Sequence, residues 1–265
     1  MSATLKNIII AVTGASGAIY ARQVVEMLLA SGQVGRLALV FTTNGEAVSR
    51  YEGVGFGGDG LRDEVTSASG CGERSGERLR STGRKAGVNR RQVEYCRTCS
   101  DSRDAKEEDE VRRTFSATAS AAERASGPCA GDLSSDPRVE IFDNDDMFAS
   151  IASGSARWDA MAVVPCSMGM LGRIASGVSD DLISRAADVM LKERRRLVLV
   201  PRETPLGLIH LRNMTAVTEA GAVVLPAAPS FYSRPGSVEE LCATVSERVV
   251  SLLGVGTPGY EWKGL

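Results

Sequence analysis

A short loop of small residues, Thr13-Gly-Ala-Ser-Gly17, stands between a β-branched run and a stretch with helical spacing. Small residues let the backbone approach an anion, and the following helix offers free N–H groups and the positive end of its dipole. The hydroxyl of Ser16 adds a donor. The loop therefore favours a phosphate cradle, and a tight strand–helix turn without a ligand is the alternative. None of the five Tyr residues has Lys four positions later, which disfavours a short-chain nicotinamide oxidoreductase.

A second small polar loop, Pro165-Cys-Ser-Met-Gly-Met170, follows another apolar run, and Ser153-Gly-Ser155 lies upstream of it. Parallel strands end at the same edge of a sheet, so we expect both loops at one edge. Cys166 has no evident His partner, and we interpret it as a small buried residue rather than a nucleophile. His210, the single histidine, is expected to pack or cap locally.

Basic side chains could bind a second anion. Arg185 and Lys192 are seven residues apart, which places them on one face of a helix. Arg202-Glu203 follows an apolar run, again at the expected edge. Arg248 falls on or next to the apolar stripe of the last helix, where a charge is costly unless it is paired. An anionic ligand would explain this pattern, and a buried ion pair is the alternative for Arg185 and Arg248.

Aromatic side chains stand near the carboxyl end of the chain. Tyr232 ends the rigid loop Pro226-Ala-Ala-Pro-Ser-Phe-Tyr232, and Trp262 lies in Gly259-Tyr-Glu-Trp262. Surface aromatics that close a subunit contact are the alternative to a ligand-binding role.

Alternating apolar runs and helical stretches predict the elements that position these residues. We expect buried strands at 8–12, 37–41, 161–164, 197–200 and 222–225, and a possible further strand at 139–142. We expect helices at 18–30, 180–194, 206–220 with Pro205 at its first position, and 237–253 behind the capping box Ser237-Val-Glu-Glu240. The pattern predicts a doubly wound, mostly parallel α/β sheet of Rossmann-like type in one domain over 1–265.

The segment at about 54–138 resembles neither flank. It is rich in Gly, Ser, Arg and Glu and has no sustained period, so we interpret it as a long, largely disordered surface insertion, with a frameshifted stretch as the alternative. A short helix at 116–125 is possible. One Cys-x-x-Cys pair is a weak zinc signal, and plain thiols are favoured for the four cysteines of this segment, Cys71, Cys96, Cys99 and Cys129.

Composition excludes several classes of protein. The 265 residues are 43% hydrophobic and 24% charged, which is ordinary for a globular chain. With 31 basic and 33 acidic residues, the net charge of −2 disfavours a nucleic-acid partner. No stretch approaches the roughly 20 apolar residues that cross a bilayer. We therefore expect a cytoplasmic protein with reduced cysteines and no membrane partner.

Taken together, the motifs resemble the UbiX family of flavin prenyltransferases, also called the phenylacrylic acid decarboxylase family. The similarity rests on the two loops above and on several linked motifs in the same order: Asp143-Asn-Asp-Asp-Met147, Ala152-Ser-Gly-Ser155, Arg185-Ala-Ala-Asp188, Leu191-Lys-Glu-Arg194, Leu197-Val-Leu-Val-Pro-Arg-Glu203, Leu225-Pro-Ala-Ala-Pro229 and Phe231-Tyr232. It covers both flanks, about two-thirds of the chain, and excludes the insertion. Met170 departs from the pattern, since many relatives have Thr there.

The resemblance implies a flavodoxin-like homo-oligomer, commonly a dodecamer, that acts without a metal. It implies transfer of a dimethylallyl group from dimethylallyl monophosphate to N5 and C6 of reduced FMN. The product, prenylated FMN, would serve a UbiD-type decarboxylase.

By position, the resemblance also assigns roles to residues. The residues expected to hold FMN are Gly14, Ala15, Ser16, Thr42, Ser167, Met168, Gly169, Met170 and Arg202. Those expected to bind dimethylallyl phosphate are Tyr232, Arg248, Lys192, Arg185 and Trp262. Glu203, Lys192 and Ser16 form the expected catalytic set, with Glu203 as a proton relay.

Two other functions fit some of these features. One is a non-catalytic FMN-binding carrier or assembly subunit, which would not need the second set of basic residues. The other is a flavin-dependent decarboxylase of aromatic acids or cysteine peptides. The position of the lone His210, late in the chain, speaks against the cysteine-peptide type.

Overall fold

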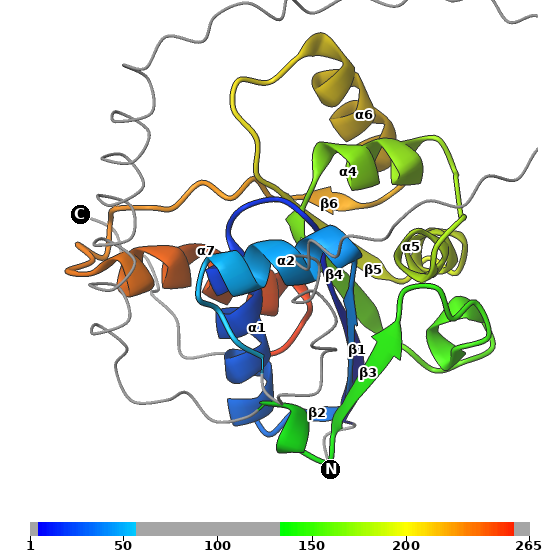
Figure 1. Ribbon diagram of the computed structural model, residues 1–265, viewed down its shortest axis with the longest axis horizontal. Coiled ribbons are helices and arrows are strands. Elements are labelled where there is room, and N and C mark those ends of the chain that lie inside the picture. The colour runs from blue at the N-terminus through cyan, green and yellow to red at the C-terminus, as the bar shows by residue number, and fades with distance from the viewer. Residues whose placement is uncertain (1–4, 57–132, 257–265) are drawn as a thin grey trace, which may run out of the picture. The chain divides into compact units, whose positions relative to one another are not determined.

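The computed structural model describes residues 5–56 and 133–256, and within them six strands form one parallel sheet in the order β3-β2-β1-β4-β5-β6 (Figure 1). The strands are β1 (Lys6–Val12), β2 (Val34–Phe41), β3 (Val139–Asp143), β4 (Ala160–Cys166), β5 (Arg196–Pro201) and β6 (Val223–Val224). This is the strand order of a Rossmann-type sheet. The predicted doubly wound parallel fold is confirmed, and so is the strand expected at 139–142.

Helices cover both faces of the sheet. They are α1 (Ala18–Ala30), α2 (Thr43–Tyr51), α4 (Met168–Ala175), α5 (Leu182–Lys192), α6 (Leu208–Glu219) and α7 (Val238–Leu252), with short 3-10 turns at Leu133–Ser135 and Ser150–Ala152. One hydrophobic cluster joins the sheet to α1 and α7, and a second joins the opposite face to α4, α5 and α6.

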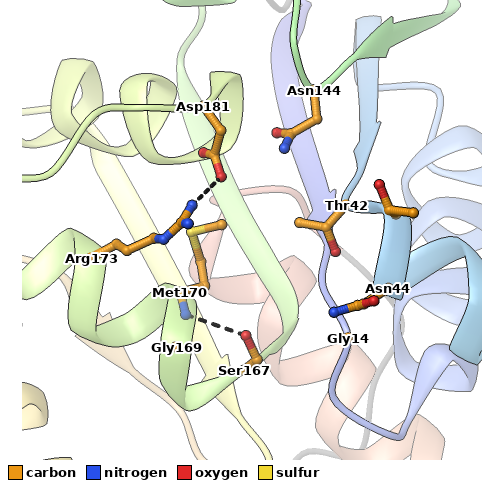
Figure 2. A pocket seen from close by; sticks show the side chains of 10 residues that line it. Gly14, Thr42, Asn44, Asn144, Ser167, Gly169, Met170, Arg173 and Asp181 are labelled. Atoms are coloured by element: carbon orange, nitrogen blue, oxygen red, sulfur yellow. Dashed lines mark hydrogen bonds and ion pairs between the residues drawn. The ribbon is translucent and has the colours of Figure 1, made fainter. Parts of the chain in front are cut away.

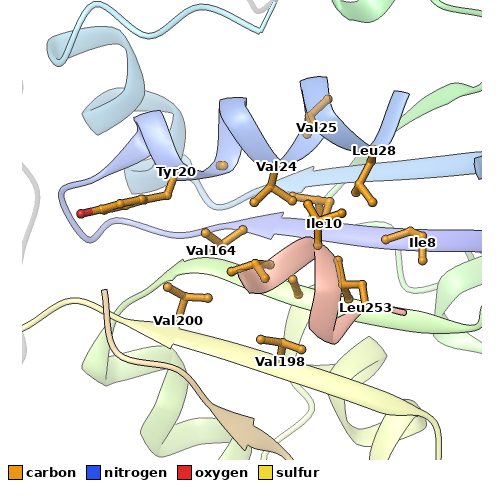
Figure 3. Packing of buried hydrophobic residues seen from close by; sticks show 14 of the residues in the cluster. Ile8, Ile10, Tyr20, Val24, Val25, Leu28, Val164, Val198, Val200 and Leu253 are labelled. Atoms are coloured by element: carbon orange, nitrogen blue, oxygen red, sulfur yellow. The ribbon is translucent and has the colours of Figure 1, made fainter. Parts of the chain in front are cut away.

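Strand β1 shows why the apolar runs form this sheet. Its side chains alternate between the two clusters: Ile8 and Ile10 pack toward α1 and α7, whereas Ile9 and Ala11 pack toward α4 and α5. All four are fully buried, and Figure 3 shows the first pair against helix and strand neighbours. A strand buried on both faces has no polar positions, which explains the uninterrupted apolar run.

The chain reverses its winding between β1 and β4, which are neighbours in the sheet. Loops that leave the carboxyl ends of such a strand pair diverge and open a crevice. A side-chain hydroxyl joins the two loops here: Thr13 Oγ1 donates to the Pro165 carbonyl at 2.8 Å and accepts from the Ser167 N–H at 2.8 Å. The two loops predicted to share an edge therefore do so.

Helix α2 was not predicted, α5 is two residues shorter at each end than expected, and α4 and α6 also differ from prediction. Residues 168–175, of which the first three were assigned to a loop, form α4, with Ser167 as its N-cap. Helix α6 begins at Leu208 with Gly207 as N-cap, so Pro205 precedes the helix rather than opening it. Ser237 caps α7 as predicted.

Several predictions fall on residues that the structure does not describe. They are most of the proposed insertion, the possible helix at 116–125, the four cysteines of that segment, and Trp262. Within the two described ranges, no helix combines the length and apolar character that crossing a bilayer requires.

Candidate functional site

A cavity of about 390 Å³ opens at the carboxyl ends of β1, β2 and β4. Figure 2 shows its two main walls, one from the β1 and β2 ends and the other from α4. The lining residues are Gly14, Thr42, Thr43 and Asn44 on the first wall, Ser167, Gly169, Met170 and Arg173 on the second, and Asn144 and Asp181 between them. Five of the nine residues predicted to hold FMN thus line one cavity.

Two helix N-termini face each other across this cavity. Thr42 caps α2, its Oγ1 accepting from the Gly45 N–H at 3.0 Å, and Ser167 caps α4, its Oγ accepting from the Met170 N–H at 3.3 Å. Each cap satisfies the third amide of its helix. The first two amides have no acceptor within a helix, so they and the positive dipole ends suit an anionic group.

Close backbone contact fixes the first wall. A Cβ added at Gly14 would lie 2.6 Å from the Cβ of Asn44, so the loop after β1 touches the first turn of α2. At Gly45, the added carbon would overlap the Val12 carbonyl oxygen. Helix α2 therefore lies against the end of β1 at a separation that only glycine permits.

The N-terminus of helix α5 forms the remaining side of the cavity. Its N-cap Asp181 accepts from the Ser184 N–H at 2.7 Å, and Asn144 Oδ1 accepts from the Ile183 N–H at 3.1 Å. Arg173 Nη1 donates to the same Asp181 carboxylate at 2.7 Å. The amides at the start of α5 are thus already satisfied by protein groups, whereas no group among residues 5–56 and 133–256 accepts from the first two amides of α2 or α4.

The predicted phosphate cradle at the start of α1 binds an anion of the protein itself. The N–H groups of Gly17 and Ala18 donate to the Glu52 carboxylate at 2.9 and 2.8 Å. Gly17 has φ 115°, which explains the glycine at this position. The sequence predicted a phosphate at this helix start and missed Glu52, because no local pattern links it to a loop 35 residues earlier.

Ser16 and Arg202 meet at the rim above β1 and β5. Arg202 Nε donates to the Ser16 carbonyl at 3.2 Å. The next residue, Glu203, is exposed, and its Oε1 accepts from the Thr204 N–H at 2.9 Å. Ala15 is buried beside this rim, and Met168 lies half-buried in the first turn of α4.

Arg185 and Lys192 do not line the cavity, although Arg185 stands near the start of α5, four residues after Asp181. Arg185 donates to the Ala152 carbonyl at 3.1 Å and pairs with Asp188, so its ion pair is half-exposed rather than buried. Lys192 pairs with Glu193 beside Gly154. Because α5 starts at the cavity and Lys192 ends it, about 16 Å of helix separates Lys192 from the cavity.

Tyr232 and Arg248 are exposed, Tyr232 to 72%. Val245 and Val249 of the apolar stripe expected on α7 are buried, whereas small and polar side chains take other core positions of this helix. The buried face consists of Cys242, Val245, Ser246, Val249 and Val250, whereas Val238 is exposed. Arg248 therefore points to solvent, and burial gives no reason for it to bind an anion.

Cys166 and His210 have the roles expected of them. Cys166 is fully buried, and burial raises the pKa of its thiol to about 12, which keeps it protonated at neutral pH. His210 Nδ1 accepts from the Gly207 N–H at 3.2 Å and so caps α6 locally.

Five cavity residues were not predicted as site residues: Thr43, Asn44, Asn144, Arg173 and Asp181. Asp181 carries a readable signal, an acidic residue directly before an apolar helical stretch, which is typical of an N-cap. Asn44 and Arg173 carry none, because their place depends on how α2 and α4 pack.

Comparison with known proteins decides the family. The Flavoprotein family model matches residues 101–250, more than half of the chain. A flavin prenyltransferase UbiX from Deinococcus radiodurans is 47% identical over 138 residues, which are 52% of this chain and 70% of that relative. The chain belongs to the UbiX family of flavoproteins. The UbiX of Thermoplasma acidophilum is 52% identical over 115 residues, 43% of this chain. The chain spans 64%, 56% and 61% of the length of three such relatives.

Solved structures of UbiX-like proteins have the same fold. The crystal structure of AnUbiX (PadA1) in complex with FMN and dimethylallyl pyrophosphate has a TM-score of 0.64 and 34% identity, and covers 98% of this chain and 99% of that one. A dodecameric FMN-dependent UbiX-like decarboxylase from Escherichia coli O157:H7 has a TM-score of 0.63 and 28% identity, with 98% and 100% covered.

Proposed function

We propose that this chain is a flavin prenyltransferase that transfers a dimethylallyl group from dimethylallyl monophosphate to reduced FMN. The observation that carries the proposal is the cavity at the winding reversal of a UbiX-family sheet, where the N-termini of α2 and α4 converge. An anion that is attached to an extended ligand fits this place better than a free ion does, because the cavity volume of about 390 Å³ far exceeds the ~10–15 Å³ that a single water needs.

FMN binding follows from that geometry. The first-turn amides of α2 and α4, with the hydroxyls of Thr42 and Ser167, would hold the phosphate. Gly14, Gly169 and Met170 would contact the part of FMN that joins the phosphate to the flavin ring. Ala15 and Met168 would support these cavity walls. The rim formed by Ser16 and Arg202 would contact the flavin ring.

The allyl phosphate would bind where basic and aromatic side chains from two copies meet. Lys192 lies about 16 Å along α5 from the cavity of its own chain, so a neighbouring copy brings it to a cavity more readily. Tyr232, Arg248 and Trp262 are the other proposed donor-site residues. Self-association is supported by the dodecameric relative and by a cluster of exposed apolar residues on and before α6: Leu206, Leu208, Ile209 and Leu211.

The reaction breaks the carbon–oxygen bond of the allyl phosphate and joins the prenyl group to N5, which loses its proton. A proton added to the prenyl double bond would then give a cation that bonds to C6, and C6 would release its own proton. Phosphate leaves with the electron pair, and Lys192, Arg185 and Arg248 would stabilise its charge. Tyr232 and Trp262 would face the allylic cation. Glu203, exposed at the rim, would accept the proton that N5 releases. We further propose a UbiD-type decarboxylase as the recipient of the product, and the cytoplasm as the location.

Anaerobic incubation of the full chain with reduced FMN and dimethylallyl monophosphate tests the proposal. We expect the mass of the extracted flavin to increase by one prenyl unit. Glu203→Gln should keep flavin binding and slow turnover, whereas Glu219→Gln, at the exposed end of α6, should change neither. Tight binding of FMN that stays unmodified would instead favour a carrier, and release of carbon dioxide from an aromatic acid would favour a decarboxylase.

A further inference from the structure

Of the described residues that line the cavity, Arg173 alone carries a positive charge. It stands three residues after Met170 on α4, so the two side chains share one face of the helix. The thioether of Met170 is only a weak hydrogen-bond acceptor, whereas the guanidinium of Arg173 offers five donors in a planar fork. In Figure 2, Arg173 extends along this wall toward Asp181.

The partners of Arg173 do not depend on it. Asp181 Oδ1 accepts from the Ser184 N–H at 2.7 Å and from Ser184 Oγ at 2.6 Å, so it caps α5 through the oxygen that Arg173 does not use. The second partner, Asp180, lies 3.2 Å away and is 57% exposed. The Arg173 side chain is itself 45% exposed. The pair with Asp180 is exposed on both sides and therefore weak, whereas Asp181 is only 11% exposed but keeps both bonds from Ser184 when Arg173 turns to another anion.

We propose that Arg173 is a specificity-determining residue that binds the phosphate of the flavin and so selects FMN over riboflavin. The proposal deepens the proposed function and rests on it, because it takes the ligand of the cavity to be a flavin. The guanidinium exchanges the Asp181 oxygen for phosphate oxygens, which it can bind in a bidentate manner. The amides of α2 and α4 hold the same phosphate within the cavity.

Asp181 tunes this exchange. Its carboxylate competes with the phosphate for Arg173 and repels it as a like charge. Asp181→Asn keeps an oxygen that can accept from the Ser184 N–H and removes the charge. The substitution therefore frees Arg173 while the cap of α5 remains.

Dissociation constants for FMN and riboflavin, measured by quenching of flavin fluorescence, test the proposal. Arg173→Ala should weaken FMN binding about 10- to 100-fold, the range for a lost hydrogen bond to a charged group, and leave riboflavin binding unchanged. Arg173→Lys should restore part of the loss. Arg157→Ala removes an exposed cation before β4, at the opposite edge of the sheet, and should change neither constant.

A double-mutant cycle separates ligand binding from packing. Asp181→Asn should tighten FMN binding, and most of that gain should vanish in the Arg173→Ala background. If Arg173 only clamps α4 to α5, Asp181→Asn and Arg173→Ala will both weaken FMN and riboflavin alike, which overturns the proposal. If the wild-type chain binds no flavin, the proposed function fails. Inorganic phosphate then becomes the probe, and equal phosphate affinity with and without Arg173 overturns the present inference.

Discussion

Replacing Gly14 with alanine tests whether the cavity wall depends on close backbone contact. The added carbon would lie 2.6 Å from the Cβ of Asn44, whereas carbon atoms pack at about 3.5–4.0 Å. A Cβ cannot rotate away, because its position is fixed by the backbone, and the Asn44 carbonyl carbon and Cα also lie within 3.7 Å. Helix α2 must therefore move by about 1 Å, and its first amides move with it.

The size of the effect follows from two opposing terms. Overpacking costs about 1–3 kcal/mol, and the smaller conformational entropy of an unfolded chain with alanine offsets about 0.4–1 kcal/mol. A net loss of ~1–2 kcal/mol lowers the melting temperature by about 2–8 °C for a domain of this size. FMN affinity should fall as well, because the amides of α2 no longer meet those of α4.

Gly169→Ala is the matched control, since Gly169 lines the same cavity but an added Cβ would meet nothing within 4 Å. It lies in the first turn of α4, so alanine should leave stability unchanged or raise it by up to about 1 kcal/mol. Thermal unfolding at equal protomer concentration compares the two variants. If Gly14→Ala is as stable as Gly169→Ala and binds FMN as the wild type does, the reasoning about this wall is refuted.

Three further predictions concern the scaffold. Ser237→Ala removes the N-cap of α7 and should lower the free energy of unfolding by about 0.5–2 kcal/mol. Ser251→Ala, at an exposed position in the last turn of the same helix, should not lower it. Equal losses for the two variants in urea titrations would contradict this prediction. Peptide mass mapping should show that Cys166 resists iodoacetamide in the native chain, and native alkylation would exclude its burial. Because folding raises the pKa of this thiol from 9.0 to about 12, its contribution to stability should decline as pH rises from 9 to 12. The Arg138 side chain lowers the pKa of Asp136 from 3.8 to about 2. In thermal scans, Asp136→Asn should therefore be less stable than wild type near pH 6, and the difference should disappear toward pH 2. A difference that does not depend on pH would argue against this ion pair.

Much of the fold could be predicted because its signals are local. In a chain that alternates strands and helices, the uninterrupted β-branched run of β1 predicts a strand buried on both faces of a parallel sheet. Helix α1 has the predicted bounds, Ala18–Ala30. Helix α4 was missed because its first turn, Met168-Gly-Met170, lacks a usual helix-start pattern apart from the Ser167 cap. Two glycines near the start of a helix lower its propensity, and the packing of α4 against α6 and the sheet compensates.

The site was predictable where it follows strand ends and unpredictable where it depends on packing. Gly14, Thr42 and Ser167 come directly after strands, so topology alone brings them together. The Glu52 carboxylate at the start of α1 is a contact across 35 residues that no periodicity reveals. Arg248 was misplaced because hydropathy does not count Ser246 as a core residue, although it is fully buried between α1 and α7.

The most direct test of the account is a crystal structure of this chain with FMN. We predict that the phosphate lies between α2 and α4, within hydrogen-bonding distance of amides in Thr43–Asn44 and Met168–Gly169, while the Glu52 carboxylate stays on the Gly17 and Ala18 amides. A phosphate that displaces Glu52 at the start of α1, or that lies outside the cavity, would contradict the account.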